Sequence, residues 1–348
     1  MCYGYDGDAA LRESLERKGA SRRGLIRGAA AGAAGAAVLA GGPAFAGKPG
    51  SHPGKGHGHG HGHDHGRQKE VPTDLISIQL YTLRDAMTSS ASVLQQLDQL
   101  AKFGYERVER AGLYPAAGLD TAAKLKAQFD ARGIWASSSH DGISTVDGDA
   151  TRLDPAKLNK KLDDANTFRQ KYIVVPYLNS TSKAEWQRWA EQMNTEAAAA
   201  RRRGLRYGYH NHAHEFTIDL GGGQTPWDIL TSELDRRLVH LEVDLYWAYT
   251  GGVNTGAADP LRFAIDVVRS APQEVRQYHV KDRHGADAVA LYNQQPGDMA
   301  DLGLGVIDFP TIFRAHQAEE YIVENDTPDF HPAATANTGF RYLEGLEF

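Results

Sequence analysis

The chain has 348 residues, of which 41% are hydrophobic, so it is long enough for one large domain or two small ones. Its formal net charge of −6 argues against a nucleic-acid-binding protein, because such a protein needs a basic face. Cysteine is limited to Cys2, which excludes a disulfide framework and a cysteine nucleophile in the body of the chain.

Residues 1–46 have the pattern of a twin-arginine signal peptide. Arg22 and Arg23 precede a mildly apolar, Ala/Gly-rich stretch at 28–42, and Ala44-Phe45-Ala46 offers a small-residue cleavage site. The stretch is too short and too rich in Ala and Gly for a comfortable membrane span, so we expect no permanent anchor. The pattern predicts export by the twin-arginine machinery, and therefore a periplasmic or secreted protein that folds, and loads any cofactor, before export.

Residues 47–73 are expected to form a disordered linker. The segment is rich in Gly and His, contains six of the fifteen histidines, and cannot pack a core. The alternation of His with Gly between His57 and His65 allows weak binding of Zn, Ni or Cu, but a plain flexible spacer is an equally good interpretation. Catalysis is not expected there.

From residue 74 to 348, strand-like and helix-like segments alternate. Runs of β-branched and aromatic residues predict eight strands, at 75–81, 107–111, 134–139, 172–177, 205–210, 239–244, 277–281 and 321–324. Apolar residues at helical spacing predict helices at 90–103, 121–132, 155–170, 182–203, 226–234, 260–270, about 308–318 and, weakly, 335–348. Segment 283–305 is irregular.

This alternation predicts an α/β fold, a (β/α)8 TIM barrel at 74–348. Eight strand–helix units in about 250 residues match the count and size of that barrel. A doubly wound open sheet is the alternative. No Gly-rich nucleotide-binding motif follows the first strand, which gives that alternative no functional support.

Several of the later strands run into side chains that can bind a metal ion. The fifth leads into Tyr209-His210-Asn211-His212-Ala213-His214-Glu215-Phe216, and the next three are followed by or end on Asp244, His279 and Glu324. The carboxyl ends of barrel strands meet at one face, where the active sites of such barrels lie. The sequence therefore predicts a metal site at that face.

Short motifs occur in a characteristic order between residue 75 and about residue 346. They are Ile78-Gln79-Leu80-Tyr81-Thr82-Leu83-Arg84-Asp85, Gly104-Tyr105-Glu106-Arg107-Val108-Glu109, Tyr209-His210-Asn211-His212 with Glu215-Phe216, Asp244-Leu245-Tyr246-Trp247, His279-Val280-Lys281-Asp282, Gly303-Leu304-Gly305-Val306-Ile307-Asp308-Phe309 and Glu324. In this order they resemble the xylose-isomerase-like TIM-barrel family (sugar phosphate isomerase/epimerase superfamily), which includes keto-inositol dehydratases and, distantly, the endonuclease IV enzymes.

The resemblance implies a ligand set for one divalent cation. Members of the family commonly use Glu, Asp, His and Glu from strands five to eight, which corresponds here to His210 in place of the first glutamate, then Asp244, His279 and Glu324. A His/Asp/His/Glu set is neutral with a 2+ ion and favours Mn, Co, Zn or Fe over Mg. His212 shares strand parity with His210 and could ligate instead, or bind a substrate hydroxyl.

Each of these residues also has a structural alternative. Asp244 and Glu324 could cap helices or pair with arginines, and His279 could be a hydrogen-bonded core histidine. Glu109 could form a salt bridge with the adjacent Arg110.

A cation with open positions polarises a sugar carbonyl and acidifies the neighbouring C–H, so that a carboxylate can take the proton and leave a metal-bound enediolate. A metal-bound His210 has no free lone pair with which to act as a base. We therefore expect Glu324 to be the base, Glu109 or His140 the second group, and Lys281 to stabilise charge or protonate a leaving oxygen. Such a site suits isomerisation or elimination better than epimerisation by two bases.

Predicted export and the lack of an obvious phosphate-binding motif favour an unphosphorylated sugar or keto sugar as substrate. The residues expected to bind it are His212, Trp247, Tyr246 and Phe216. Aromatic residues at such positions are as often core residues. The predicted function is a metal-dependent sugar isomerase/epimerase-type enzyme, and a homo-oligomer is compatible with it. One alternative is a lyase, dehydratase or 3-keto-glycoside-cleaving enzyme with the same metal site. A second is a non-catalytic sugar- or metal-binding protein, and the acidic balance disfavours an endonuclease IV-type phosphodiesterase.

Overall fold

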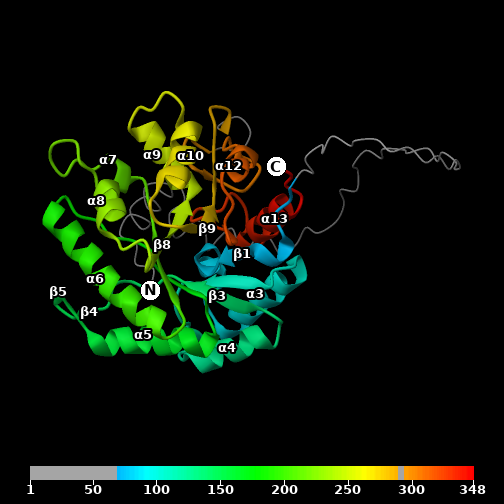
Figure 1. Ribbon diagram of the computed structural model, residues 1–348. Helices are drawn as coiled ribbons and strands as arrows, with labels where there is room; N and C mark the ends of the chain where they lie inside the picture. Colours follow the sequence, from blue (N-terminus) through cyan, green and yellow to red (C-terminus); the bar gives the residue numbers. More distant parts are fainter. Residues whose placement is uncertain (1–68, 289–293) are drawn as a thin grey trace, which may run out of the picture.

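The structure is a computed structural model that describes residues 69–288 and 294–348 (Figure 1). The predicted signal peptide at 1–46 and the predicted linker as far as residue 68 lie outside the described residues. The last part of that linker belongs to the fold. Lys69 and Phe348 exchange two backbone hydrogen bonds of 2.7 and 2.8 Å, and Val71 is buried.

Eight parallel strands form one sheet in the order β3-β2-β1-β12-β9-β8-β7-β6. Their bounds are β1 (Ile76–Gln79), β2 (Arg107–Arg110), β3 (Trp135–Ser139), β6 (Tyr172–Val175), β7 (Arg206–His210), β8 (Val239–Asp244), β9 (Val275–Val280) and β12 (Glu320–Val323). A parallel bridge between His140 and Val174 joins the two ends of this order. The sheet is therefore a closed barrel, as predicted, and the open-sheet alternative is wrong.

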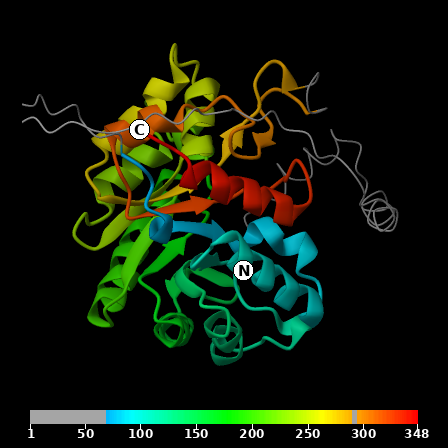
Figure 2. The same cartoon turned by 90° about the vertical axis from the view of Figure 1, so that its right-hand side faces the viewer.

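Helices surround the barrel (Figure 1). The predicted helices correspond to α3 (Ser90–Phe103), α4 (Ala122–Asp130), α5 (Pro155–Phe168), α6 (Lys183–Arg202), α8 (Pro226–Glu233), α10 (Pro260–Ser270), α12 (Phe309–Ala315) and α13 (Pro332–Glu344). Asp154, Asp259 and Asp308 cap three of them, each followed by a proline within the first turn, where its missing N–H costs nothing. The C-terminal helix α13 packs against α3, as the red and cyan helices of Figure 2 show.

Several short elements were not predicted. They are the helices α7 (His214–Thr217) and α9 (Leu245–Asn254), the hairpin β4 (Thr145–Val146) and β5 (Asp149–Leu153), and the hairpin β10 (Asp282–Arg283) and β11 (Met299–Ala300). Helix α9 starts directly after β8 because the Asp244 carboxylate caps it, accepting the Trp247 N–H at 2.9 Å. This cap uses one oxygen of a residue that was predicted as a metal ligand.

The interior of the barrel has a polar layer nearer the N-terminal ends of the strands. Gln277 donates to Glu320 at 3.1 Å, and its amide oxygen lies 2.9 Å from Nε2 of His240. The His240 ring fills the space above Gly208, where an added Cβ would lie 2.5 Å from Nε2. Hydrogen bonding within the layer therefore replaces part of the apolar packing of an ordinary barrel.

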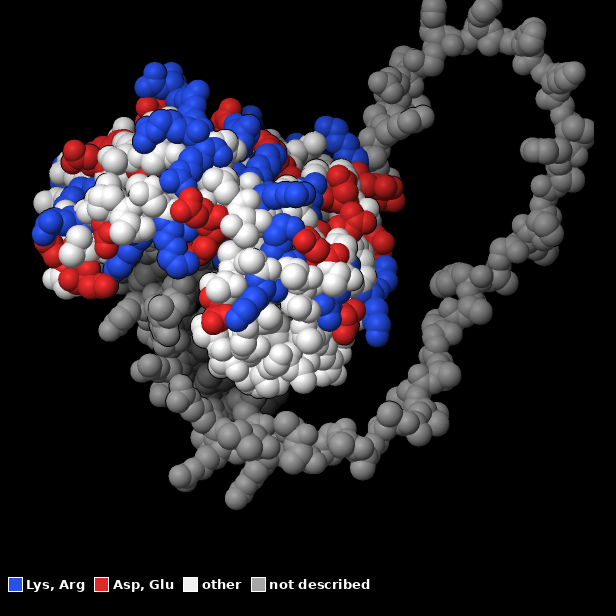
Figure 3. Space-filling model, turned by 90° about the horizontal axis from the view of Figure 1, so that it is seen from below, with Lys and Arg blue, Asp and Glu red and all other residues white. Residues whose placement is uncertain are grey.

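Charged groups of both signs are interspersed on the face shown in Figure 3, with no continuous basic surface there. Within 69–288 and 294–348, no helix combines the length and the apolar composition that crossing a membrane requires.

Candidate metal centre and active site

The carboxyl ends of six strands bring a set of titratable side chains together inside the barrel. They are Glu109, His140, His210, Glu242, Asp244, His279, Lys281 and Glu324, and all of them are buried. The sheet register explains part of the convergence. His210 is paired with Glu242 and Asp244 with His279, so each pair points to the same side of the sheet.

One group of possible metal ligands consists of His140, His210, Glu242 and His279, whose donor atoms lie within 4.8 Å of one another. A single oxygen of Glu242, Oε1, lies 2.8 Å from Nε2 of His140, 3.2 Å from Nδ1 of His210 and 3.0 Å from Nε2 of His279. The other oxygen, Oε2, is buried and has no hydrogen-bond partner among the described residues. Glu242 thus holds three imidazole rings in place.

A second group, closer to the strand ends, consists of Asp244, His279 and Glu324. Nδ1 of His279 lies 2.6 Å from Oε2 of Glu324. Lys281 Nζ lies 2.7 Å from Glu324, 3.0 Å from Asp244 and 3.2 Å from Asp326. Three of the four predicted ligands therefore form one group.

His279 belongs to both groups and uses a different nitrogen in each. Its Nε2 faces Glu109 at 2.8 Å and Glu242 at 3.0 Å, whereas its Nδ1 faces Glu324. His210 is divided in the same way, with Nδ1 toward Glu242 and Nε2 3.7 Å from Oδ2 of Asp244. A carboxylate on the far nitrogen is how proteins orient a histidine that binds metal through the near one.

The sequence analysis missed Glu242. It lies inside β8, two residues before Asp244, whereas the predicted ligands lie at or near the ends of strands. The spacing of two was the available signal, since residues i and i+2 of a strand share a face. A glutamate on the barrel side of an otherwise apolar strand needs partners, and here those partners are the three histidines.

The charge balance fits a divalent cation. Five buried carboxylates surround the site (Glu109, Glu242, Asp244, Glu324 and Asp326), and among the described residues Lys281 is the one lysine or arginine within ion-pair distance of them. Burial raises the pKa of Asp244 to about 6, and burial together with the nearby Glu242 raises that of Glu109 to about 7. A bound 2+ ion would offset this excess of negative charge.

Burial alone would lower the pKa of His279. The surrounding carboxylates, Glu242 foremost and then Glu324 and Glu109, outweigh burial and hold this pKa well above its ordinary value. In the absence of a metal, the imidazolium therefore serves as one of the counter-charges of the site.

Glu109 does not pair with Arg110. Its carboxylate accepts hydrogen bonds from Gln79 at 3.1 Å and Ser138 at 3.0 Å, and it contacts His279. Arg110 instead binds Gln170 at 2.9 Å and lies 4.3 Å from the centroid of the Phe168 ring. The salt-bridge alternative for Glu109 is therefore not observed.

His140 lies between the Glu242 and Glu109 carboxylates. Its Nε2 is 2.8 Å from the first and 3.2 Å from the second, and its ring stacks on that of His279 with centroids 5.0 Å apart. The ring of His140 therefore supports the ring of His279 by stacking on one of its faces.

The predicted aromatic residues separate into two sets. His212 and Trp247 lie side by side, with ring centroids 5.3 Å apart, and the Trp247 ring lies 5.9 Å from Lys281 Nζ. His212 Nδ1 and Trp247 Nε1 are both buried without a hydrogen-bond partner among the described residues, so they are suited to bind hydroxyl groups.

The other two aromatic residues have structural contacts. Tyr246 donates to the Gly297 carbonyl at 2.9 Å and so anchors the segment after β10. Phe216 packs against Trp227 and Phe263, with centroids 5.0 and 5.4 Å apart, in the helix layer. Phe216 therefore occupies the core position that the sequence analysis left open as its alternative.

The Gly303-Leu304-Gly305 motif is explained by Asp282. The carboxylate of Asp282 accepts the backbone N–H groups of Gly303, Gly305 and Ile307 at 3.1, 3.0 and 3.1 Å. Asp282 directly follows Lys281, so this clasp holds the excursion after β9 beside the candidate site. A side chain at Gly305 would collide with the clasp.

Replacing Asp282 by Ala should release this clasp. Three charge-assisted hydrogen bonds are lost, so we expect amide hydrogen exchange at Gly303, Gly305 and Ile307 to accelerate on the order of tenfold or more. Hydrogen exchange measured by mass spectrometry checks this. Asp287→Ala, at an exposed position in the same excursion, is the matched control, and equal acceleration in both variants would contradict the clasp.

A closed eight-stranded barrel with buried histidines and carboxylates at the carboxyl ends of its strands has the architecture of a TIM-barrel enzyme. The family model described as xylose isomerase-like TIM barrel matches residues 97–346, and the chain belongs to this family. No curated protein matches the chain in sequence.

Solved structures share the fold. A sugar phosphate isomerase/epimerase from Parabacteroides distasonis ATCC 8503 is 21% identical, with a TM-score of 0.60 over 77% of this chain and 93% of that one. A probable 3-DHS dehydratase from Bacillus anthracis is 14% identical, with a TM-score of 0.55 over 77% and 98%. An L-ribulose 3-epimerase is 16% identical, with a TM-score of 0.52 over 77% and 92%. At these identities the similarity establishes the fold alone.

Proposed function

We propose that the protein is a divalent-metal-dependent isomerase/epimerase-type enzyme that removes a proton from the carbon beside a carbonyl of an unphosphorylated sugar or keto sugar. The observation that carries this proposal is the convergence of His210, Asp244, His279 and Glu324 at the carboxyl end of the barrel. Membership of the xylose isomerase-like family supports it.

In this proposal, Nε2 of His210, Nδ1 of His279 and the carboxylates of Asp244 and Glu324 hold one ion. Support comes from the opposite nitrogens of the two histidines, which both face Glu242. The mixed nitrogen and oxygen set suits Mn, Co, Zn or Fe better than Mg. A bound ion would polarise a substrate carbonyl and acidify the adjacent C–H.

Glu324 is the proposed base. Although burial alone would raise its pKa, the nearby Lys281 and His279 outweigh burial and hold this pKa well below its ordinary value, so the group is a carboxylate. Its Oε2 contacts His279 and Lys281, while its Oε1 makes no hydrogen bond with a described residue and can approach a substrate C–H. Lys281, 2.7 Å away, can protonate an oxygen of the substrate.

The pairing of Glu324 with Lys281 favours a second candidate reaction, elimination. A carboxylate that takes a proton and an ammonium group that protonates a leaving oxygen are the two groups that a lyase or dehydratase needs. His210, which lacks a free lone pair when it ligates, provides no second base on the opposite face. Cleavage of a 3-keto glycoside would use the same two groups.

The local charge supports an unphosphorylated substrate. Five carboxylates lie in the site, and a phosphate group would meet repulsion from each of them unless a cation intervened. The twin-arginine pattern at 22–23 is consistent with this proposal, because sugar phosphates are intracellular compounds. We propose that His212 and Trp247 bind the hydroxyl groups of the sugar.

Proton exchange with solvent tests the proposal directly. The full-length protein, supplied with Mn or Co, is incubated in deuterated water with a panel of free sugars, keto sugars and 3-keto glycosides. We expect deuterium at the carbon beside the carbonyl of at least one compound, detected by nuclear magnetic resonance. The products then separate the reactions, since isomerisation conserves the atoms of the sugar and elimination releases water or an alcohol. Saturable sugar binding without exchange across the panel would favour a binding protein instead.

A further inference from the structure

A polar cavity lies at the opposite end of the barrel from the candidate metal centre. Its volume is about 320 Å³, and residues at or just before the N-terminal ends of β7, β8 and β9 line it. These include Arg206 at the start of β7, Val239 at the start of β8 and Arg276 near the start of β9. The cavity is therefore separate from the acidic site at the carboxyl ends of the same strands.

The lining is strongly basic. Five arginines contribute to it, namely Arg201, Arg206, Arg236, Arg237 and Arg276, against one carboxylate, that of Glu274. They come from three different connections between a helix and the next strand. The chain as a whole carries a net charge of −6, so this local excess of positive charge runs against its composition.

Only some of these arginines have a protein partner. Arg276 forms ion pairs with Glu274 and Glu319, and Arg237 lies 2.8 Å from Asp235. Arg201, Arg206 and Arg236 form no ion pair within the described part of the chain, and all three are exposed. These guanidinium groups are thus not held by a carboxylate, and those that face the cavity are available to a ligand.

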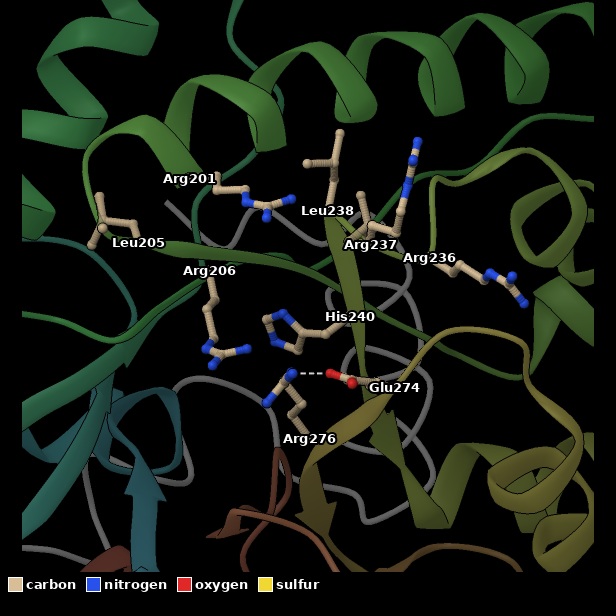
Figure 4. A pocket seen from close by; sticks show the side chains of 11 residues that line it. Arg201, Leu205, Arg206, Arg236, Arg237, Leu238, His240, Glu274 and Arg276 are labelled. Carbon is tan, nitrogen blue, oxygen red and sulfur yellow. Dashed lines mark ion pairs between the residues drawn. The ribbon is translucent and has the colours of Figure 1, made fainter.

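Figure 4 shows how the side chains are arranged. Arg206 and Arg276 extend toward the imidazole of His240, and the guanidinium of Arg201 lies above them in this view, while the ion pair to Glu274 holds Arg276 in place. His240 is buried and hydrogen-bonded to Gln277, so it forms a fixed polar floor. Arg237 and Arg236 extend away from this group in different directions, Arg237 upward and Arg236 to the right in this view.

A purely structural role accounts for part of this cluster. Arg201 lies in the last turn of α6, where a positive charge stabilises the negative end of the helix dipole. Neither Arg206, at the start of a strand, nor Arg236, in a loop, has such a role. The structural explanation therefore does not account for Arg206, which extends toward His240 beside Arg276.

We propose that this cavity binds a small, multiply charged oxyanion that carries phosphate or sulfate groups. Guanidinium groups recognise such oxygens through paired N–H donors, and a basic concavity concentrates anions against the overall charge of a protein. The volume is in the range of small-molecule sites, which begin at roughly 300 Å³. The anion would be a ligand other than the sugar, because the acidic site at the opposite end repels it.

Calorimetric titration of the full-length protein with inorganic tripolyphosphate, and with sulfate, tests this. Sulfate is included because it does not strip metal ions. We expect the double variant Arg201→Gln/Arg206→Gln to bind tripolyphosphate on the order of tenfold or more weakly than the natural chain. Arg202→Gln is the matched control, since Arg202 is exposed on the same helix turn and does not line the cavity. Its affinity should stay unchanged.

The outcomes divide clearly. Absence of tripolyphosphate binding to the natural chain would overturn the proposal. An equal loss of affinity in Arg202→Gln would also overturn it, because the effect would then come from the net charge of the protein. Citrate distinguishes the chemistry, because tighter binding of citrate through the same arginines would replace phosphate or sulfate by a carboxylate ligand. If the double variant does not fold, the single variant Arg206→Gln, at an exposed position at the start of β7, carries the same comparison.

Discussion

Replacing Glu324 by Gln should abolish turnover while the fold stays intact. The variant loses the proposed base and one charged ligand at once, so we expect kcat to fall by roughly 10²- to 10⁴-fold or more. Gln preserves the size of the side chain and can still accept a hydrogen bond from Lys281, so the barrel should persist. Initial rates on any compound that the exchange experiment identifies measure the loss of turnover. Circular dichroism checks that the fold is intact.

The control for this variant is Glu344→Gln, the same change at the last residue of α13. It should leave turnover unchanged. Near-natural rates in Glu324→Gln would remove its assigned role and make Glu109, which also contacts His279, the next candidate for the base.

Replacing His279 by Gln should remove the bound metal. His279 belongs to both groups of donor atoms, so its loss weakens the site whichever group holds the ion. We expect the natural chain to carry close to one equivalent of a divalent metal after dialysis, and the variant almost none. Elemental analysis of the dialysed proteins measures this. His316→Gln, at a histidine just after α12, is the control and should retain the metal.

Two further variants locate the ion within the cluster. Asp244→Asn removes a proposed ligand and should abolish stoichiometric binding. Glu242→Gln alters the group that orients His210 and His279, and it should lower affinity by roughly 10- to 100-fold without preventing saturation. If Glu242→Gln abolished stoichiometric binding and Asp244→Asn only weakened it, the ion would lie among His140, His210 and Glu242 instead.

The barrel was predictable because its evidence is local. Each strand and each surrounding helix has its own periodicity, and the carboxyl ends of parallel strands must meet, so Asp244, His279 and Glu324 could be brought together without coordinates. The helix α9 was not predictable in the same way. It begins directly after Asp244, which was predicted as the end of a strand, and Gly251 and Gly252 weaken its helical pattern.

The remaining features depend on contacts across the barrel. The orientation of His210 and His279 is set by Glu242, whose role becomes visible only when three strands are aligned. Phe216 could have faced either the sugar or the helices, and its packing against Phe263 from a distant segment decides the question. The arginines of the basic cavity come from three connections that the sequence does not relate to one another.

The pairing of the first and last segments of the barrel domain affects when the barrel can close during synthesis. Lys69 is hydrogen-bonded to Phe348, the last residue, and β1 is paired with β12. During synthesis the partner of the first segment therefore leaves the ribosome long after that segment, and contacts between such distant parts of a chain form late. The barrel can therefore close only after β12 has been synthesised, so the earlier strands must stay unsealed while most of the domain is being made.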